Sequence, residues 1–353
     1  MSNTTTRQRL LSHFNTYPQL RIQDIFKYLH QSVFGCEHMI SSPERAVTYI
    51  QTEAQSDPCS GDASVESLDG EYSRVPLAYL SKGLSAETLG KLFYLSASAE
   101  KDTAERLDDR LNIAEQLIAE GKISLSLSDF KAARARWQAD GYPAIHHSEA
   151  FREAYHPSYR VISNKYIPYL DLLARLDKML EVGNVKLAIE GSSASGKTTL
   201  ADLLEQIYDC TVFHMDDFFL RPEQRTEERF AQPGGNIDKE RFLDEVLLPL
   251  SRGDSINYHR FDCSTFTLTE PVSVTPKCLT VIEGAYSMHP ELAKYYDLSV
   301  FLNISAELQK KRIEHRNSPG MALRFFNEWI PMERKYFEAF DIKAQCGMTI
   351  DIT

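Results

Sequence analysis

The sequence predicts an α/β fold with a doubly wound parallel sheet in the second half of the chain, preceded by a mainly α-helical domain. In the second half, short apolar runs alternate with helical segments, and a glycine-rich turn follows the first run. Such alternation is typical of a parallel sheet with helices on both faces. In the first half, apolar residues recur at helical spacing, and no strand-like alternation of comparable length occurs. We therefore expect a helical domain over residues 1–180 and an α/β domain over residues 181–353.

The composition is that of an ordinary globular protein. A chain of 353 residues is long enough for two domains that each bury a core. The formal net charge of -11 argues against bulk binding to nucleic acid or to an anionic membrane surface, because both need a basic footprint. No run of 18 apolar residues occurs, and the six cysteines form no Cys-x-x-Cys pair. We expect a cytoplasmic protein with reduced thiols, and the sequence leaves its oligomeric state open, a homo-oligomer included.

Five segments of the first half have helical patterns. Each has apolar residues at helical spacing, a capping residue before it or a glycine after it. Residues 55–73 are polar and rich in Ser, Asp and Gly, which predicts a solvent-exposed loop. The predicted helices cover residues 21–33, 43–54, a segment that begins at Ser85, 104–120, and a segment from the cap Ser128 to Ala139.

A segment rich in histidine and tyrosine, Ile145–Ile162, stands apart in the first half. One interpretation is a substrate or regulatory surface, or a metal site built from His146, His147, Glu149 and His156. The other is a helix start and a domain junction whose histidines are hydrogen-bonded locally. The segment lacks a dependable ligand spacing such as His-x-x-x-His, and this favours the second interpretation over a metal site.

The strongest motif is Gly191-Ser-Ser-Ala-Ser-Gly-Lys-Thr-Thr199, which lies between the apolar run Val185–Ile189 and the helical segment Leu200–Ile207. Its spacing and its flanks fit the phosphate-binding loop (P-loop) between a strand and a helix. The glycines let consecutive backbone N–H groups face an anion, and the following helix adds its positive end. The motif predicts a nucleoside triphosphate site formed by Gly191, Ser192, Ser193, Ala194, Ser195, Gly196, Lys197, Thr198 and Thr199. Lys197 would reach the outer phosphates, and Thr198 would offer its hydroxyl to magnesium.

Carboxylates follow two of the predicted strands. The run Cys210–Met215 leads into Asp216 and Asp217, and the run Cys278–Ile282 leads into Glu283. Because ligands gather at the carboxyl ends of parallel strands, we expect these side chains beside the phosphate loop. A carboxylate there can accept the proton of an attacking hydroxyl or hold magnesium, and Glu283 suits the metal and its waters. The alternative for the aspartate pair is a cap on the next helix.

A basic helix is predicted after the fourth strand, Leu298–Ile304. Arg312 and Arg316 lie at i and i+4 and therefore on one face of this helix. Arginine suits the charge that develops on a transferred phosphoryl group, so we expect a lid function, with a solvated basic helix as the alternative. The chain is expected to close with a helix over 329–340 and a strand over 348–352.

Taken together, these motifs resemble a known group of enzymes. The phosphate loop is followed by His214-Met-Asp-Asp-Phe-Phe219, by Val281-Ile-Glu-Gly-Ala-Tyr286, and by an arginine-bearing segment that ends in Asn317-Ser-Pro-Gly320. This set resembles the uridine kinase and nicotinamide riboside kinase group of P-loop kinases over roughly residues 183–353. The resemblance implies the P-loop NTPase fold, ATP and Mg²⁺ as donor and metal, and a small-molecule hydroxyl acceptor.

The resemblance also implies roles for single residues. Asp216 matches the catalytic aspartate that activates the acceptor hydroxyl, and Lys197 and Thr198 match the triphosphate and magnesium residues. Glu283 resembles the carboxylate after the third strand, while Arg312 and Arg316 resemble the lid arginines. The Asp216-Asp217-Phe218-Phe219 segment is nearer to the riboside kinase form than to the uridine kinase form. Contacts to the acceptor are implied for Asp217, Asp238, Tyr258 and Arg260.

Three hypotheses for function follow. The first is an ATP- and Mg²⁺-dependent kinase that phosphorylates a hydroxyl of a nucleoside-like or other sugar-containing metabolite. The second is a regulatory ATP-binding switch with slow hydrolysis, whose output is the helical domain. A GTPase is disfavoured because no Asn-Lys-x-Asp signature follows the loop, and a motor-type ATPase because Glu283 stands alone. The third is a separate enzyme or binding module in the helical half, with His146, His147 and His156 at its site.

Overall fold

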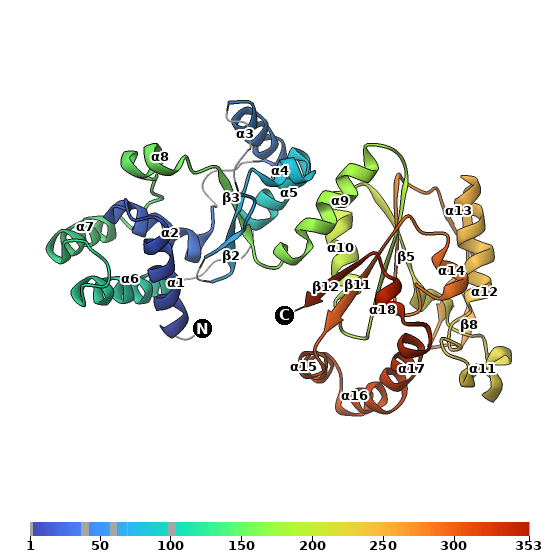
Figure 1. The fold of residues 1–353 in the computed structure, drawn as a ribbon. Coiled ribbons are helices and arrows are strands. Elements are labelled where there is room, and N and C mark those ends of the chain that lie inside the picture. Colours follow the sequence, from blue (N-terminus) through green and yellow to red (C-terminus); the bar gives the residue numbers. More distant parts are fainter. Residues whose placement is uncertain (1–2, 37–41, 57–61, 69, 98–103, 353) are drawn as a thin grey trace. The chain divides into compact units, whose positions relative to one another are not determined.

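Two units with different architectures make up the chain, Met1–Asp177 and Lys178–Thr353. The structure is a computed structural model, drawn in Figure 1. Among the residues it describes, none of the helices combines the length and apolar character needed to cross a bilayer. The described residues are 3–36, 42–56, 62–68, 70–97 and 104–352.

Helices make up most of the first unit, as predicted. The predicted helical segments all form, with ends within two residues of those expected. The cap of α7 is Ser126 instead of the predicted Ser128, because the Ser126 side chain accepts a hydrogen bond from the Asp129 N–H at 3.3 Å. The helices are α1 (Asn3–Thr16), α2 (Ile22–Phe34), α3 (Pro43–Ser56), α4 (Tyr79–Lys82), α5 (Ala86–Ala97), α6 (Ala104–Ala119), α7 (Leu127–Ala139) and α8 (Glu149–Tyr155), with a 3₁₀ turn at Ile167–Tyr169. α9 (Leu170–Leu180) begins in the first unit and ends in the second.

The first unit also contains a small sheet that the sequence analysis missed. It is antiparallel, with the order β1-β2-β3, and consists of Glu66–Ser67, Tyr72–Pro76 and Tyr159–Ser163. The prediction of a loop over 55–73 is therefore wrong at β1 and at the start of β2; residues 57–61 and 69 lie outside the described part. Tyr72 to Val75 are all buried, so β2 lacks the apolar-polar alternation by which a half-exposed strand is recognised.

Arg74 of the central strand β2 is a buried cation, with 2% of its surface exposed. Its Nε and Nη2 donate to Gln31 Oε1 at 3.0 and 2.8 Å, and its Nη1 donates to Glu66 Oε2 at 3.0 Å. The guanidinium carbon lies 4.6 Å from the centroid of the Tyr159 ring. A buried charge is tolerated only when it is paired and hydrogen-bonded, and these contacts provide both conditions.

Asp24 of α2 is completely buried and joins the helix to the segment before α8. It accepts hydrogen bonds from the Arg21 N–H at 2.9 Å and from the Ser148 N–H and hydroxyl at 2.8 and 2.6 Å. His147 Nδ1 lies 3.0 Å from Asp24 Oδ1, and His147 Nε2 lies 2.7 Å from the Tyr159 hydroxyl. Burial lowers the pKa of His147 to about 4, so the ring is neutral and donates from Nδ1 to the aspartate.

The second unit contains the predicted parallel sheet, with the order β12-β11-β4-β10-β5. All four strand pairs are parallel, so the strands end at the same edge. The central strand β4 has β10 on one side and β11 on the other, which places the turn after β4 in the middle of that edge. The strands are β4 (Val185–Gly191), β5 (Cys210–His214), β10 (Leu279–Glu283), β11 (Leu298–Ile304) and β12 (Met348–Ile352).

Helices cover both faces of this sheet (Figure 1). α10 contacts β4, β5 and β10, whereas Ala188, Phe213 and Ile282 belong to a core cluster with side chains of α12, α14 and α17. Because alternate strand residues point to opposite faces, α10 covers one face of the sheet, and the core cluster with α12, α14 and α17 lies on the other face. The helices are α10 (Lys197–Ile207), α11 (Glu227–Ala231), α12 (Lys239–Phe242), α13 (Leu248–Arg252), α14 (Pro290–Ala293), α15 (Ala306–Arg316), α16 (Pro319–Arg324), α17 (Ile330–Phe340) and α18 (Ile342–Gln345).

Shorter elements complete the second unit. A π-helical turn, η6 (Phe325–Trp329), joins α16 to α17, so the closing helix predicted over 329–340 is the end of a longer helical stretch. The remaining elements are η3 (Met215–Phe218), η4 (Pro222–Gln224) and η5 (Leu243–Leu247), and two antiparallel pairs, β6 (Ile256–Tyr258) with β9 (Val272–Val274) and β7 (Phe261–Asp262) with β8 (Thr267–Leu268).

Replacement of Asp24 by alanine should destabilise the first unit by about 3 kcal/mol or more, because several buried donors would lose their acceptor. Hydrogen exchange measured by mass spectrometry should show faster opening within residues 3–177 and unchanged protection in the sheet of the second unit. Asp62→Ala, at an exposed aspartate that accepts hydrogen bonds from Ser64, is the control. Equal protection in the two variants would contradict a stabilising role for the Asp24 contacts.

Candidate functional site

The glycine-rich turn joins the end of β4 to the start of α10, as the motif predicts. Gly191 has a φ of 150°, and a Cβ there would lie 2.7 Å from the Leu302 carbonyl oxygen, so only glycine fits. Gly196 caps α10 with a φ of 101°. The Lys197 ammonium group donates to the carbonyl oxygens of Gly191 at 2.9 Å and Ser192 at 3.1 Å. Lys197 therefore lies over the turn, at the positive end of α10.

Thr198 and Glu283 lie together beside the turn. The Thr198 hydroxyl donates to Glu283 Oε1 at 3.1 Å, and Glu283, at the end of β10, is 6% exposed. A hydroxyl and a carboxylate are oxygen ligands of the type that magnesium prefers, and magnesium keeps several waters and phosphate oxygens as its other ligands. The donor set therefore fits this ion, although no group of three or more His, Cys, Asp or Glu side chains in the described ranges could hold a metal alone.

His214 contacts Glu283 as well, and the sequence analysis assigned it no role. Its Nδ1 lies 2.7 Å from Glu283 Oε1. The hydrogen bond to this carboxylate raises the pKa of His214. The histidine is the last residue of β5, the strand next to β10, so its position two residues before Asp216 was the available signal.

The aspartate pair lies in η3, directly after β5. Asp216 is exposed to solvent, although nearby protein atoms displace part of the water around its carboxyl group. This partial desolvation raises the pKa of Asp216, while the positive charge of Lys197 opposes the increase. Asp217 Oδ2 is buried and accepts no hydrogen bond within the described part of the chain, and Arg260 Nε lies 3.5 Å from it. Neither aspartate caps the next helix, whose N-cap is Thr226.

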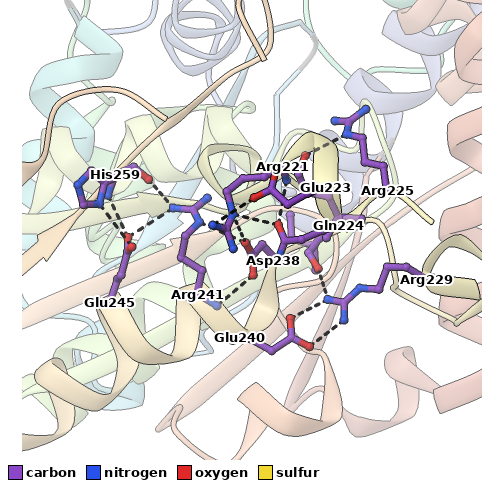
Figure 2. Close-up of polar contacts among 12 residues, drawn as sticks. Arg221, Glu223, Gln224, Arg225, Arg229, Asp238, Glu240, Arg241, Glu245 and His259 are labelled. Atoms are coloured by element: carbon purple, nitrogen blue, oxygen red, sulfur yellow. Dashed lines mark hydrogen bonds and ion pairs between the residues drawn. The ribbon is translucent and has the colours of Figure 1, made fainter. Parts of the chain in front are cut away.

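Asp238 lies between two arginines, as Figure 2 shows. It is 1% exposed and caps α12, since its Oδ1 accepts from the Arg241 N–H at 3.2 Å. Its Oδ2 has no hydrogen-bond donor among the described residues. The Nε atoms of Arg221 and Arg241 lie 3.6 and 3.5 Å from this oxygen, within ion-pair distance. Asp238 therefore has one structural oxygen and one buried oxygen that can still accept a hydrogen bond.

Tyr258 is part of the core of the second unit. The residue is 2% exposed, and its ring centroid lies 5.4 Å from that of Phe213 and 5.7 Å from that of Phe218. Only its hydroxyl is directed to a polar neighbour, Arg260, whose Nε lies 3.4 Å away. The ring is therefore closed in by protein, whereas the Arg260 side chain is 52% exposed beside Asp217.

The two arginines of α15 have different surroundings. Arg312 Nη1 donates to the carbonyl oxygens of Ala194 at 3.2 Å and Ser195 at 3.4 Å, so this side chain contacts the phosphate loop. The Arg316 guanidinium carbon lies 5.7 Å from the centroid of the Phe325 ring and forms a cation–π contact there. The structure thus brings Arg312, but not Arg316, into contact with the loop.

Two buried glutamates near the loop were missed by the sequence analysis. Glu190, the residue before Gly191, accepts from the N–H groups of Gly191 at 2.9 Å and Met288 at 3.0 Å and from the Tyr336 hydroxyl at 3.1 Å. Glu333 of α17 accepts from the Ser193 N–H at 2.9 Å. Glu190 lies at the end of an apolar strand, and Glu333 lies in a helix with no unusual pattern. Neither residue therefore stands in a sequence motif that indicates a contact with the loop.

Within the described part of the first unit, His146, His147 and His156 are not arranged as a metal site. His147 is engaged by Asp24 and Tyr159, as described above, and His146 accepts a hydrogen bond from Gln23 through its backbone carbonyl at 2.8 Å. His156 ends α8 with a φ of 42°. The contacts of His147 match the interpretation of locally hydrogen-bonded histidines.

Several solved structures resemble about half of this chain. The chain is similar to a "possible uridine kinase" from Bacillus stearothermophilus at 23% identity, over 51% of this chain and 100% of that chain, with a TM-score of 0.39. A "putative fructose transport system kinase" from Silicibacter has 23% identity over 47% and 89% of the two chains, with a TM-score of 0.38. Shikimate kinase from Bacteroides thetaiotaomicron has 14% identity over 47% and 86%, with a TM-score of 0.28. No protein-family model and no curated protein matches the chain.

Stability should depend on the titration of Glu190. Burial raises the pKa of Glu190 from its usual 4.5 to about 7, so its contribution to stability is complete below pH 4.5 and is lost as the pH rises through about 7. The free-energy advantage of the wild type over Glu190→Gln should therefore shrink by up to about 3 kcal/mol between pH 5 and pH 8. Denaturant unfolding at several pH values measures this difference. A difference that does not change with pH would contradict a raised pKa for Glu190.

Proposed function

We propose that residues 181–353 form an ATP- and Mg²⁺-dependent small-molecule kinase, which transfers the γ-phosphoryl group to a hydroxyl of a nucleoside-like or other sugar-containing metabolite. The observation that supports it best is the meeting of a phosphate loop, an oxygen-ligand pair and an aspartate at one edge of the sheet. Lys197 and Thr198 follow β4, Glu283 ends β10, and Asp216 follows β5, and these three strands are neighbours in the sheet. We also propose that the reaction takes place in the cytoplasm, without a nucleic-acid or membrane partner.

The donor side would be formed by the loop. Its backbone N–H groups and the positive end of α10 would bind the phosphates, and Lys197 would exchange its two carbonyl contacts for phosphate oxygens. Thr198 and Glu283 would hold magnesium together with water. When bound, this ion neutralises the charge that develops on the transferred group. Most of the catalysis would be positioning and charge stabilisation.

The acceptor side would be formed by aspartates. Asp216 would accept the proton of the attacking hydroxyl, because it follows the strand next to β10 and the charge of Lys197 favours its ionised form. Asp217 and Asp238 each have a buried oxygen with no hydrogen-bond donor in the described ranges. Arginines lie within ion-pair distance of both oxygens, and a ligand with several hydroxyl groups would supply the hydrogen-bond donors that buried polar atoms normally have. A regulatory switch would need neither these acceptors nor Asp216.

The direct test is a screen of purified full-length protein with magnesium and ATP against nucleosides, vitamin-like alcohols and sugars. Phosphorylation would add the mass of one phosphoryl group to the acceptor. The assignment requires at least one acceptor whose phosphorylation disappears without magnesium. Slow ATP hydrolysis that no acceptor changes would instead favour the switch, with the helical unit as its output.

Lys197→Ala should reduce turnover by about 100-fold or more, because the phosphates would lose their charged partner inside the loop. Its melting temperature should stay close to that of the wild type, since the hydrogen bonds of Lys197 within the described residues go to loop carbonyls. Lys310→Ala, at an exposed lysine of α15, is the matched control and should keep full activity. Phosphorylation by Lys197→Ala at the wild-type rate would refute the assignment.

Asp216→Asn should slow the chemical step by roughly 100-fold to 10,000-fold, the usual contribution of a general base. ATP affinity should change little, because the proton is accepted from the other substrate. Single-turnover kinetics and equilibrium ATP binding separate the two effects. Asp244→Asn, at an exposed aspartate of η5, is the control. Equal losses in rate and in affinity would indicate that Asp216 holds the metal instead.

A further inference from the structure

We propose that Glu333 of α17 is a positioning residue, which holds the phosphate loop in its nucleotide-binding conformation. This inference rests on the proposed function of the loop. It concerns a residue that lies more than a hundred positions after the loop and belongs to none of the motifs in the sequence. Its role would be to fix the shape of the loop, without contact to the transferred group.

Both oxygens of the Glu333 carboxylate accept hydrogen bonds from one loop residue, Ser193. Its Oε2 accepts from the Ser193 N–H at 2.9 Å, and its Oε1 accepts from the Ser193 hydroxyl at 2.5 Å. The residue is only 5% exposed. Hydrogen bonds to an ionised carboxylate are stronger than those between neutral groups, and burial reduces competition from water. Ser193 is therefore fixed through both its backbone and its side chain.

The next residue, Ala194, explains why the loop needs such support. Its φ is 62°, which is a left-handed conformation that is unfavourable for every residue with a Cβ. The peptide group before Ala194 is held by Gln309, whose Nε2 donates to the Ser193 carbonyl at 2.9 Å. The peptide group after it is held by Arg312, through the Ala194 carbonyl at 3.2 Å. Together with Glu333, these contacts hold Ala194 from both sides, and strained residues persist only where the surroundings fix them.

α17 is itself fixed to the strand that precedes the loop. Tyr336, one turn after Glu333, is fully buried and donates to Glu190 Oε2 at 3.1 Å. Glu190 in turn accepts from the Gly191 N–H, at the start of the loop. One helix therefore holds the loop at Gly191, through Glu190, and at Ser193. This arrangement gives Glu333 a rigid base from which to position the loop.

The negative charge of Glu333 distinguishes two effects on nucleotide binding, one through the conformation of the loop and one through electrostatic attraction. Burial raises the pKa of Glu333, and the positive charge of Lys197 opposes the increase. An ionised Glu333 would repel phosphate, whereas Lys197 attracts it. Any benefit of Glu333 to nucleotide binding must therefore come from the hydrogen bonds to Ser193. A glutamine keeps an oxygen that can accept from the Ser193 N–H but carries no charge.

The test is the affinity of full-length protein for Mg-ATP, measured by calorimetry, with melting temperatures alongside. We expect Glu333→Ala to weaken binding about tenfold, the effect of roughly 1.4 kcal/mol of lost preorganisation. Glu333→Gln should stay within about threefold of the wild type. Glu338→Ala, at an exposed glutamate of the same helix, should bind as the wild type does.

A second variant tests the link to Ala194. Ala194→Gly removes the penalty of the left-handed conformation, so the double variant Ala194→Gly/Glu333→Ala should regain at least half of the lost binding free energy. Absence of this recovery would overturn the link. If Glu333→Ala does not fold, Ser193→Ala, which removes only the hydroxyl bond, and Glu333→Gln decide the question. Wild-type affinity in Ser193→Ala together with weak binding by Glu333→Gln would overturn the proposal.

The remaining outcomes separate this inference from the kinase proposal. Wild-type affinity in a folded Glu333→Ala variant would overturn the role of Glu333 and leave the kinase proposal intact. Equally weak binding by Glu333→Gln and Glu333→Ala would assign the effect to charge and overturn the role in shape. Failure of the wild type to bind Mg-ATP, with Lys197→Ala giving the same result, would overturn the proposed function and with it this inference.

Discussion

The second unit depends on a single buried carboxylate at the end of its central strand. Glu190 joins three segments, because it accepts from the loop at Gly191, from the turn after β10 at Met288 and from α17 at Tyr336. Its surroundings are apolar enough to raise its pKa to about 7, so the carboxyl group is retained at a cost in desolvation. The three hydrogen bonds to Glu190 offset part of this cost, and they fix the geometry at the edge of the sheet where the phosphate loop begins.

Local chemistry explains which features could be predicted from the sequence. The phosphate loop could be predicted because its glycines and Lys197 lie within nine consecutive residues and each has one physical reason for its place. The parallel sheet could be predicted because each buried strand is one short apolar run. The strands β1 to β3 could not, because β2 pairs with β3 far along the chain and has no exposed face to give alternation.

The same distinction applies to the candidate site. Asp216, Thr198 and Glu283 follow strands or the loop directly, so strand order alone places them at one edge. Glu333 and Gln309 reach the loop from helices whose patterns show nothing unusual, and only the packing of α15 and α17 reveals them. Tyr258 is a different case, because its role as an acceptor contact stays a prediction. An aromatic residue in a motif suggests a ligand contact, but its ring is needed between Phe213 and Phe218 in the core.

The π-helical turn η6 gives the end of the chain an unusual sensitivity to length. It joins α16 to α17 without a break, and Phe325 within it lies under Arg316. A π turn contains one residue more than an α-helical turn, and successive helical residues are rotated by about 100°. Loss of a single residue between 325 and 329 would restore a regular α-helix. It would also rotate Glu333 by about 100° around the helix axis relative to Phe325. Point substitutions in this stretch would preserve the phase, so natural variation here should change side chains and conserve residue number.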